Sequence, residues 1–184
     1  RVDVVSERVR CVRGTALSAH AWVVLGDDVV AVVDTGSLDR APLLVEGLAQ
    51  MGLAPKDVGL VLNTHEHFDH VGGNGVFPKT TLIAAHASAA RKIAENDRFV
   101  TMIDSPPLRR ASVLLTDGAE LDLGGVTLRA LHSPGHTSGS TCFLERDEGL
   151  LFSGDTLFAG GVLSYIAESG SLGDYIASLT RLST

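Results

Sequence analysis

Residues 63–74, NTHEHFDHVGGN, place four candidate metal ligands within six positions, directly after an apolar run that predicts a buried strand. In an extended chain the side chains at i and i+2 project to the same side, so His65, His67 and Asp69 can converge. His70 has the opposite parity and joins them only if the chain bends, which the glycine pair after it permits. The spacing therefore predicts a ligand-bearing loop at a strand end.

Imidazole and carboxylate side chains in this pattern suit a transition metal. They favour zinc, with iron or manganese as alternatives, and the cluster is denser than one tetrahedral ion requires. Two Zn²⁺ ions are therefore the expected cofactors. A surface cluster of polar residues is the competing interpretation, which the position after an apolar strand disfavours.

The rest of the chain predicts one mixed α/β domain over residues 1–184. β-branched and apolar runs predict strands at residues 2–12, 21–25, 29–33, 58–62, 81–85, 120–123, 126–131, 141–145 and 150–153. Helices are predicted at 41–50, at 86–95 and after a capping-box-like Ser171, the last with Ile176, Leu179 and Leu182 as its apolar face. Residues 97–110 predict an exposed excursion that could form a flap near a site.

The composition and net charge of the chain limit the classes of molecule that it is expected to bind. A formal net charge of -7 argues against nucleic acid, and no apolar run approaches the roughly 20 residues of a membrane span. Cys11 and Cys142 are too few for a disulfide framework, which favours a reducing, cytoplasmic compartment, although the chain opens at Arg1 without an initiator Met. A small-molecule substrate is expected, and the oligomeric state is left open.

Three further segments extend the pattern: DTG at 34–36, SPGHT at 133–137 and FSGDTL at 152–157. With the HxHxDH motif they make the chain resemble the metallo-β-lactamase superfamily, in the style of hydroxyacylglutathione hydrolases and other thioesterase-like members. The resemblance implies an αβ/βα four-layer sandwich with two mixed β-sheets. It also implies a further ligand histidine after the last helix. All seven histidines lie at or before His136, so that ligand lies beyond Thr184, is disordered, or is absent from this protein. The last predicted helix stops short, which favours a ligand beyond Thr184 and a domain that is incomplete at its C-terminus.

The resemblance also implies roles for individual side chains. By this resemblance one metal ion would be held by His65, His67 and His136, and a second by Asp69 and His70, with Asp155 as the bridge between them. A hydroxide held by the two cations would be the nucleophile, and Asp69 would accept a hydrogen bond from the attacking water. Asp34 would orient a ligand histidine from outside, unless it merely caps the following helix.

These features predict a metal-dependent hydrolase of a small ester, thioester or lactone. The alternatives are an iron-dependent oxygenase similar to persulfide dioxygenases, a β-lactam hydrolase, and a non-catalytic binding module; a nuclease is disfavoured by the net charge. His20, His86, His132 and Tyr165 are interpreted as structural residues, because a lone histidine or tyrosine is more often packed than functional.

Overall fold

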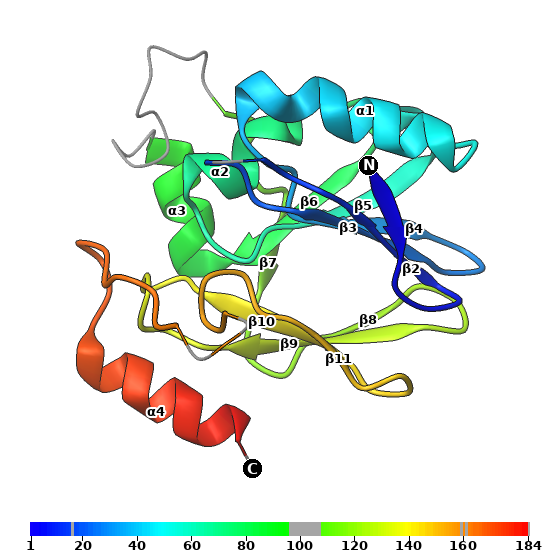
Figure 1. Ribbon diagram of the computed structural model, residues 1–184. Coiled ribbons are helices and arrows are strands. Elements are labelled where there is room, and N and C mark those ends of the chain that lie inside the picture. The colour runs from blue at the N-terminus through cyan, green and yellow to red at the C-terminus, as the bar shows by residue number, and fades with distance from the viewer. Residues whose placement is uncertain (16, 96–107, 159, 161, 184) are drawn as a thin grey trace.

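The computed structural model describes residues 1–15, 17–95, 108–158, 160 and 162–183, and shows two β-sheets stacked between helices (Figure 1). The larger sheet contains β1 (Val2–Val4), β2 (Val9–Val12), β3 (Ala21–Leu25), β4 (Val30–Val33), β5 (Val58–Leu62), β6 (Leu82–His86) and β7 (Val113–Leu115), in that order. The smaller sheet, in the order β11-β10-β9-β8, contains β8 (Glu120–Asp122), β9 (Thr127–His132), β10 (Thr141–Glu145) and β11 (Leu150–Phe152).

Helices flank the two sheets. They are α1 (Ala41–Gln50), α2 (Phe68–Val71), α3 (Ala87–Glu95) and α4 (Leu172–Leu182), with short 3-10 turns η1 (Leu38–Arg40), η2 (Pro55–Asp57) and η3 (Gly72–Val76). Figure 1 shows α1 above the larger sheet and α4 beyond the smaller one, so the layers run helix, sheet, sheet, helix. The predicted four-layer α/β fold is confirmed. Within the described residues no helix has the length and apolarity needed to cross a membrane.

The larger sheet is mixed, and its parallel half positions the site. Strands β1 to β4 pair antiparallel, whereas β4, β5, β6 and β7 pair in parallel, with Val33 opposite Leu62 and Leu62 opposite Ala84. Parallel neighbours end at the same edge of a sheet, so the segments that follow β4 and β5 lie side by side. Asp34 and the HxHxDH loop start there.

Two apolar cores hold the layers together. One lies between the sheets and includes Val33, Leu62, Leu128 and Phe143. The other lies between the larger sheet and α1, whose Leu44 and Leu48 are buried in it together with residues of β3, β4 and β5. Successive side chains of a strand point to opposite faces of the sheet, so the strands of the larger sheet contribute apolar side chains to both cores. Burial of apolar surface is the dominant stabilising term of a fold.

The smaller sheet is antiparallel across its four described strands. Gly124 and Gly125 form the turn between β8 and β9, as predicted, and both have the positive φ (81° and 68°) that a tight hairpin turn requires. Ser171 caps α4 as expected, because its side chain accepts a hydrogen bond from the Asp174 backbone N–H.

Several predicted elements are wrong in detail. The strand expected at 2–12 is two strands, β1 and β2, joined by a turn, and His86 ends β6 instead of opening α3. The buried face of α4 is Tyr175 and Ser178, whereas Ile176 is 57% exposed, because Tyr175 packs against Gly135 and Ser178 Oγ donates to the Pro134 carbonyl. Most of the excursion predicted at 97–110 lies outside the described residues.

Candidate metal centre

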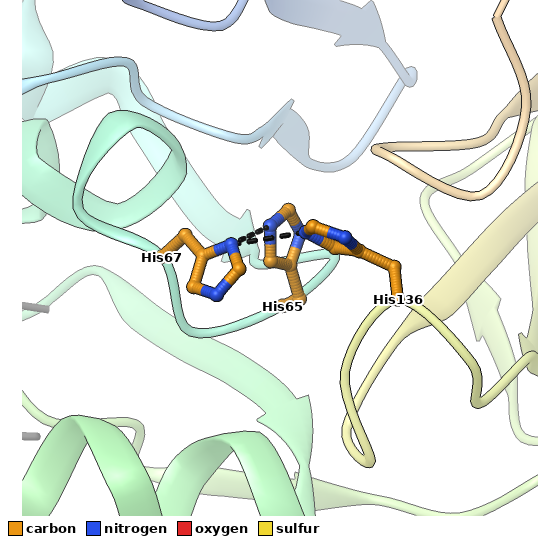
Figure 2. Close-up of side chains that lie close together, drawn as sticks. All are labelled: His65, His67 and His136. Carbon is orange, nitrogen blue, oxygen red and sulfur yellow. Dashed lines mark hydrogen bonds between the residues drawn. The ribbon is translucent and has the colours of Figure 1, made fainter. Parts of the chain in front are cut away.

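Three histidines from two separate loops meet at one point. His65 and His67 lie in the loop after β5, and His136 lies in the loop between β9 and β10. His67 Nδ1 lies 3.1 Å from His65 Nε2 and 3.0 Å from His136 Nε2, and all three side chains are buried (Figure 2). The chain therefore gathers three imidazole nitrogens in one small volume.

The outer partners of these rings determine where their protons lie. His136 Nδ1 donates to the Tyr165 carbonyl oxygen at 2.8 Å, which leaves Nε2 as a lone pair directed at the cluster. Thr64 Oγ1 donates to Asp34 at 2.7 Å and so can accept from His65 Nδ1 at 3.1 Å, which leaves the His65 Nε2 lone pair facing inward as well. At most one proton, on His67 Nδ1, can then lie among the three nitrogens.

Such a convergence of lone pairs fits a cation. Nitrogen ligands about 2.0–2.1 Å from a tetrahedral zinc ion would be about 3.3 Å apart, close to the 3.0–3.1 Å observed between ring nitrogens. Burial and the neighbouring imidazoles hold the pKa of His65 well below its usual range and lower the pKa of His67 to about 3. Both rings are therefore neutral at physiological pH, the state in which imidazole binds a metal.

A second group of donors shares His65 with the first. Ligand atoms of His65, His70 and Asp155 all lie within 4.8 Å of one another. The two carboxylate oxygens of Asp155 face different histidines: Oδ1 lies 3.2 Å from His70 Nε2, and Oδ2 lies 3.4 Å from His136 Nε2. Asp155 thus stands between the two groups, where a bridging carboxylate would stand.

Asp34 is placed behind His70 and not at a helix cap. Its Oδ2 accepts from His70 Nδ1 at 2.7 Å, and its Oδ1 accepts from the Thr64 backbone N–H at 2.9 Å. This bond directs His70 Nε2 toward Asp155, because a proton on Nδ1 leaves Nε2 as the free nitrogen. Asp34 has φ 55°, a left-handed conformation that aspartate tolerates better than most residues, and strained backbone of this kind clusters at functional sites.

Charges within the second group shift its pKa values in opposite directions. Burial alone would lower the pKa of His70, but Asp34 and Asp155 outweigh it and raise that pKa well above its usual range. Burial would raise the pKa of Asp155, but the hydrogen bond and charge of His70 outweigh it and lower that pKa. The carboxylates around His70 therefore favour positive charge at this position.

Asp69 lies at the margin of this arrangement. Its Oδ2 is 3.6 Å from His70 Nε2, and its side chain is not among the ligand groups that the described residues form within 4.8 Å. Burial, with the nearby charge of Asp155, raises its pKa. The structure thus brings together the other five predicted ligands and leaves Asp69 beside them.

A cavity of about 610 Å³ opens next to this second group. Asp69, His70 and Asp155 line it together with apolar side chains that include Trp22 and Phe158. Trp22 and Phe152 both line the cavity, and their rings pack against each other with centroids 5.8 Å apart. A cavity that combines apolar side chains with several polar groups is a common form of small-molecule site.

Close backbone approach brings the segment containing Asp155 to the other ligands. A Cβ at Gly154 would meet Thr64 Oγ1 at 2.5 Å, and the residue has φ 50°, so only glycine fits this position. Below the HxHxDH loop, Asn63 and Asn74 exchange two side-chain hydrogen bonds, and Thr35 Oγ1 donates to Asn74. These contacts fix the loop from beneath.

The histidines interpreted as structural lie outside both donor groups. His20 Nδ1 accepts from the Gly14 backbone N–H, and the His132 ring stacks on His86 with centroids 3.8 Å apart. Tyr165 differs from the expectation of a packed residue: it is 59% exposed, and its ring lies parallel to His67 at 6.1 Å.

Sequence reasoning missed the residues that hold the ligand rings, such as Thr64 and Ser164. Ser164 Oγ lies 3.0 Å from His136 Nδ1, beside the Tyr165 carbonyl, although 28 residues separate it from that histidine. Only the immediate neighbour of a ligand in sequence, such as Thr64, could have been suspected from the motif itself.

Comparison with known proteins agrees with this geometry. The sequence model of the metallo-beta-lactamase superfamily matches residues 14–184. The chain belongs to this superfamily. Human acyl-coenzyme A thioesterase MBLAC2 is 33% identical over 190 residues, which cover 89% of this chain and 67% of that protein. A hydroxyacylglutathione hydrolase of Methylococcus capsulatus is 43% identical over 104 residues, which cover 56% of this chain and 36% of that protein.

Solved structures of the superfamily share the fold. A metallo-beta-lactamase of Cronobacter sakazakii superposes with a TM-score of 0.80 at 23% identity, covering 98% of this chain and 73% of that one. At this identity the likeness shows the architecture alone. The hydrolase relatives indicate an enzyme, and the histidine and aspartate groups could bind metal.

Proposed function

We propose that this protein is a hydrolase with two zinc ions that cleaves a small ester, thioester or lactone. One observation carries the proposal: His67 Nδ1 lies 3.1 Å from His65 Nε2 and 3.0 Å from His136 Nε2. Hydrogen-bond partners outside the cluster leave the Nε2 lone pairs of His65 and His136 directed inward. We assign these three residues to one ion. His70 and Asp69 would serve the second, with Asp155 between them.

Zinc ions at these positions would lower the pKa of a bound water toward neutrality and stabilise negative charge on a carbonyl oxygen. The chain's own hydrogen-bond acceptors orient the ligand histidines. Asp34 keeps the proton of His70 on Nδ1, and the Tyr165 carbonyl keeps that of His136 on Nδ1. We assign to the Asp69 carboxylate the acceptance of a hydrogen bond from the attacking water, beside His70.

The relatives favour a thioester over the other substrates. Thioesterase is the activity named for the human relative, and this chain covers 67% of that protein. The apolar side chains that line the 610 Å³ cavity, Trp22 and Phe158 among them, suit the acyl part of such a substrate. Asp69, His70 and Asp155 line the same cavity and would lie near the bond to be cleaved. Two free, buried cysteines support a reducing, cytoplasmic setting for this activity.

Metal analysis combined with substrate panels tests the proposal. The purified protein is expected to contain about two zinc ions per chain and to hydrolyse thioesters, with activity lost on chelation and restored by zinc. Activity on all substrates that survives complete metal removal would contradict it. One iron per chain, with oxygen consumption in place of hydrolysis, would favour the persulfide dioxygenase-like alternative, and turnover of β-lactams alone would favour the β-lactamase alternative.

A further inference from the structure

Glu66 is a buried carboxylate between two of the proposed ligands. Its side chain is only 2% exposed, although it lies in a loop and separates His65 from His67 in sequence. Both carboxylate oxygens are engaged by groups outside the histidine cluster. A buried carboxylate is costly unless it is paired and hydrogen-bonded, so the partners of Glu66 identify what it holds.

Those partners come from three separate segments. Thr137 Oγ1 donates to Glu66 Oε2 at 3.0 Å, Ser169 Oγ donates to Oε1 at 3.3 Å, and Lys92 Nζ lies 3.5 Å from Oε1. Lys92 belongs to α3, and its side chain is 14% exposed. The carboxylate therefore ties the loop after β5 to a helix and to two loops distant in sequence.

The contact with Thr137 matters most, because Thr137 follows His136 directly. Its hydroxyl accepts from the Gly139 backbone N–H and interacts with Ser140 Oγ, which in turn accepts from the Thr137 backbone N–H. Thr137 is thus fixed in a closed turn, and its one hydroxyl proton is left for Glu66. This bond joins the loop that carries His65 and His67 to the loop that carries His136, and the Thr141 backbone N–H adds a bond to the Thr64 carbonyl oxygen between the same two segments.

We propose that Glu66 is a positioning residue that makes the three-histidine cluster converge before a cation binds. The inference rests on the proposed metal site and adds a residue to it. A ligand set that is already assembled spares the metal the free energy of ordering two loops, which raises affinity. Lys92 supplies a positive charge 3.5 Å from the buried carboxylate, so Glu66 has a charged partner outside the histidine cluster.

Zinc affinity of the intact protein tests this role without relying on turnover. We expect Glu66→Ala to weaken binding of the tighter zinc ion about 10- to 100-fold in competition with a chromophoric chelator. Glu66→Gln keeps an acceptor for Thr137 and should lose less. Cobalt substituted for zinc should show a weaker tetrahedral absorption band in the alanine variant, which a general loss of stability would not produce.

Glu145 provides a matched control. It is also a buried glutamate (3% exposed), and its carboxylate accepts from the backbone N–H groups of Asp147 and Glu148 in the turn after β10. Glu145→Gln should lower the melting temperature without changing zinc affinity. An equal loss of affinity in Glu145→Gln would show that the Glu66 effect is unspecific and would overturn the inference.

Thr137→Val keeps the test decisive if Glu66→Ala fails to fold. It removes the hydroxyl that donates to Glu66, so it should weaken zinc binding more than Glu66→Gln does, because glutamine keeps an acceptor for that hydroxyl. Wild-type affinity in folded Thr137→Val or Glu66→Ala would refute the positioning role alone. A wild-type protein that binds no zinc would refute the metal site itself, and this inference with it.

Discussion

Replacing Asp34 by asparagine should weaken the binding of the second metal ion while leaving the fold intact. The carboxylate accepts from the Thr64 backbone N–H, from Thr64 Oγ1 and from His70 Nδ1, at 2.9, 2.7 and 2.7 Å. Asparagine keeps an oxygen for the backbone N–H but presents N–H donors to the other two groups. His70 would then move its proton to Nε2, the nitrogen that faces Asp155.

The size of the effect follows from the two inverted bonds. Each hydrogen bond to a charged group contributes about 1.5–3 kcal/mol, and rotation of the Thr64 hydroxyl recovers part of the loss, so we expect roughly 2–4 kcal/mol less stability in the metal-free protein. Loss of the outer partner of a ligand histidine costs about 10- to 100-fold in metal affinity. Asparagine tolerates the φ of 55° at this position, so backbone strain does not confound the comparison.

Denaturant unfolding of the metal-free protein measures the first quantity, and stepwise metal titration measures the second. Asp117→Asn is the matched control, because Asp117 also accepts from a backbone N–H and pairs with Arg181, yet its side chain is 51% exposed. That change should cost less than about 1 kcal/mol and leave metal binding unchanged. Wild-type affinity for the second metal ion in Asp34→Asn would refute the assigned role of the carboxylate.

Other predictions address the ligands, the pH dependence and the core. His67→Ala and Asp155→Ala should each lower metal content and turnover by at least tenfold, whereas His20→Ala should leave the metal content unchanged; equal losses of metal in elemental analysis would contradict the assigned ligands. Because the pKa of His70 is raised, a proton on its ring competes with the second metal ion. The affinity for that ion should therefore rise as the pH rises toward this pKa. Calorimetry in buffers with different heats of ionisation would measure the protons released on binding. The low pKa of His67, about 3, should let the first ion survive to lower pH than the second. Phe143→Ala, at a fully buried position between the sheets, should cost about 3–5 kcal/mol in denaturant unfolding, and a loss below 1 kcal/mol would contradict its place in that core.

Local sequence predicted much of the fold correctly, because the signals were local. Helix α1 begins at a proline-containing first turn and ends at Gln50, two residues before Gly52, which has φ 74°. The hairpin at Gly124 and Gly125 and the cap at Ser171 follow from backbone preferences of the same kind. The exposed Ile176 shows the limit, because the choice of which face of α4 is buried depends on the loop beneath that helix and not on the helix itself.

The amino-acid sequence by itself determined the donor types, because the spacing of His65, His67, Asp69 and His70 is a property of a few adjacent residues. Only the tertiary structure decided how donors from distant segments meet. The parallel pairing of β4 with β5 places Asp34 behind His70, and the proximity of the two loops places Glu66 under Thr137. The physical reason is that a hydrogen bond acts over about 3 Å. Partners that are tens of residues apart come within this distance only through the packing of the sheets, so no sequence spacing predicts them.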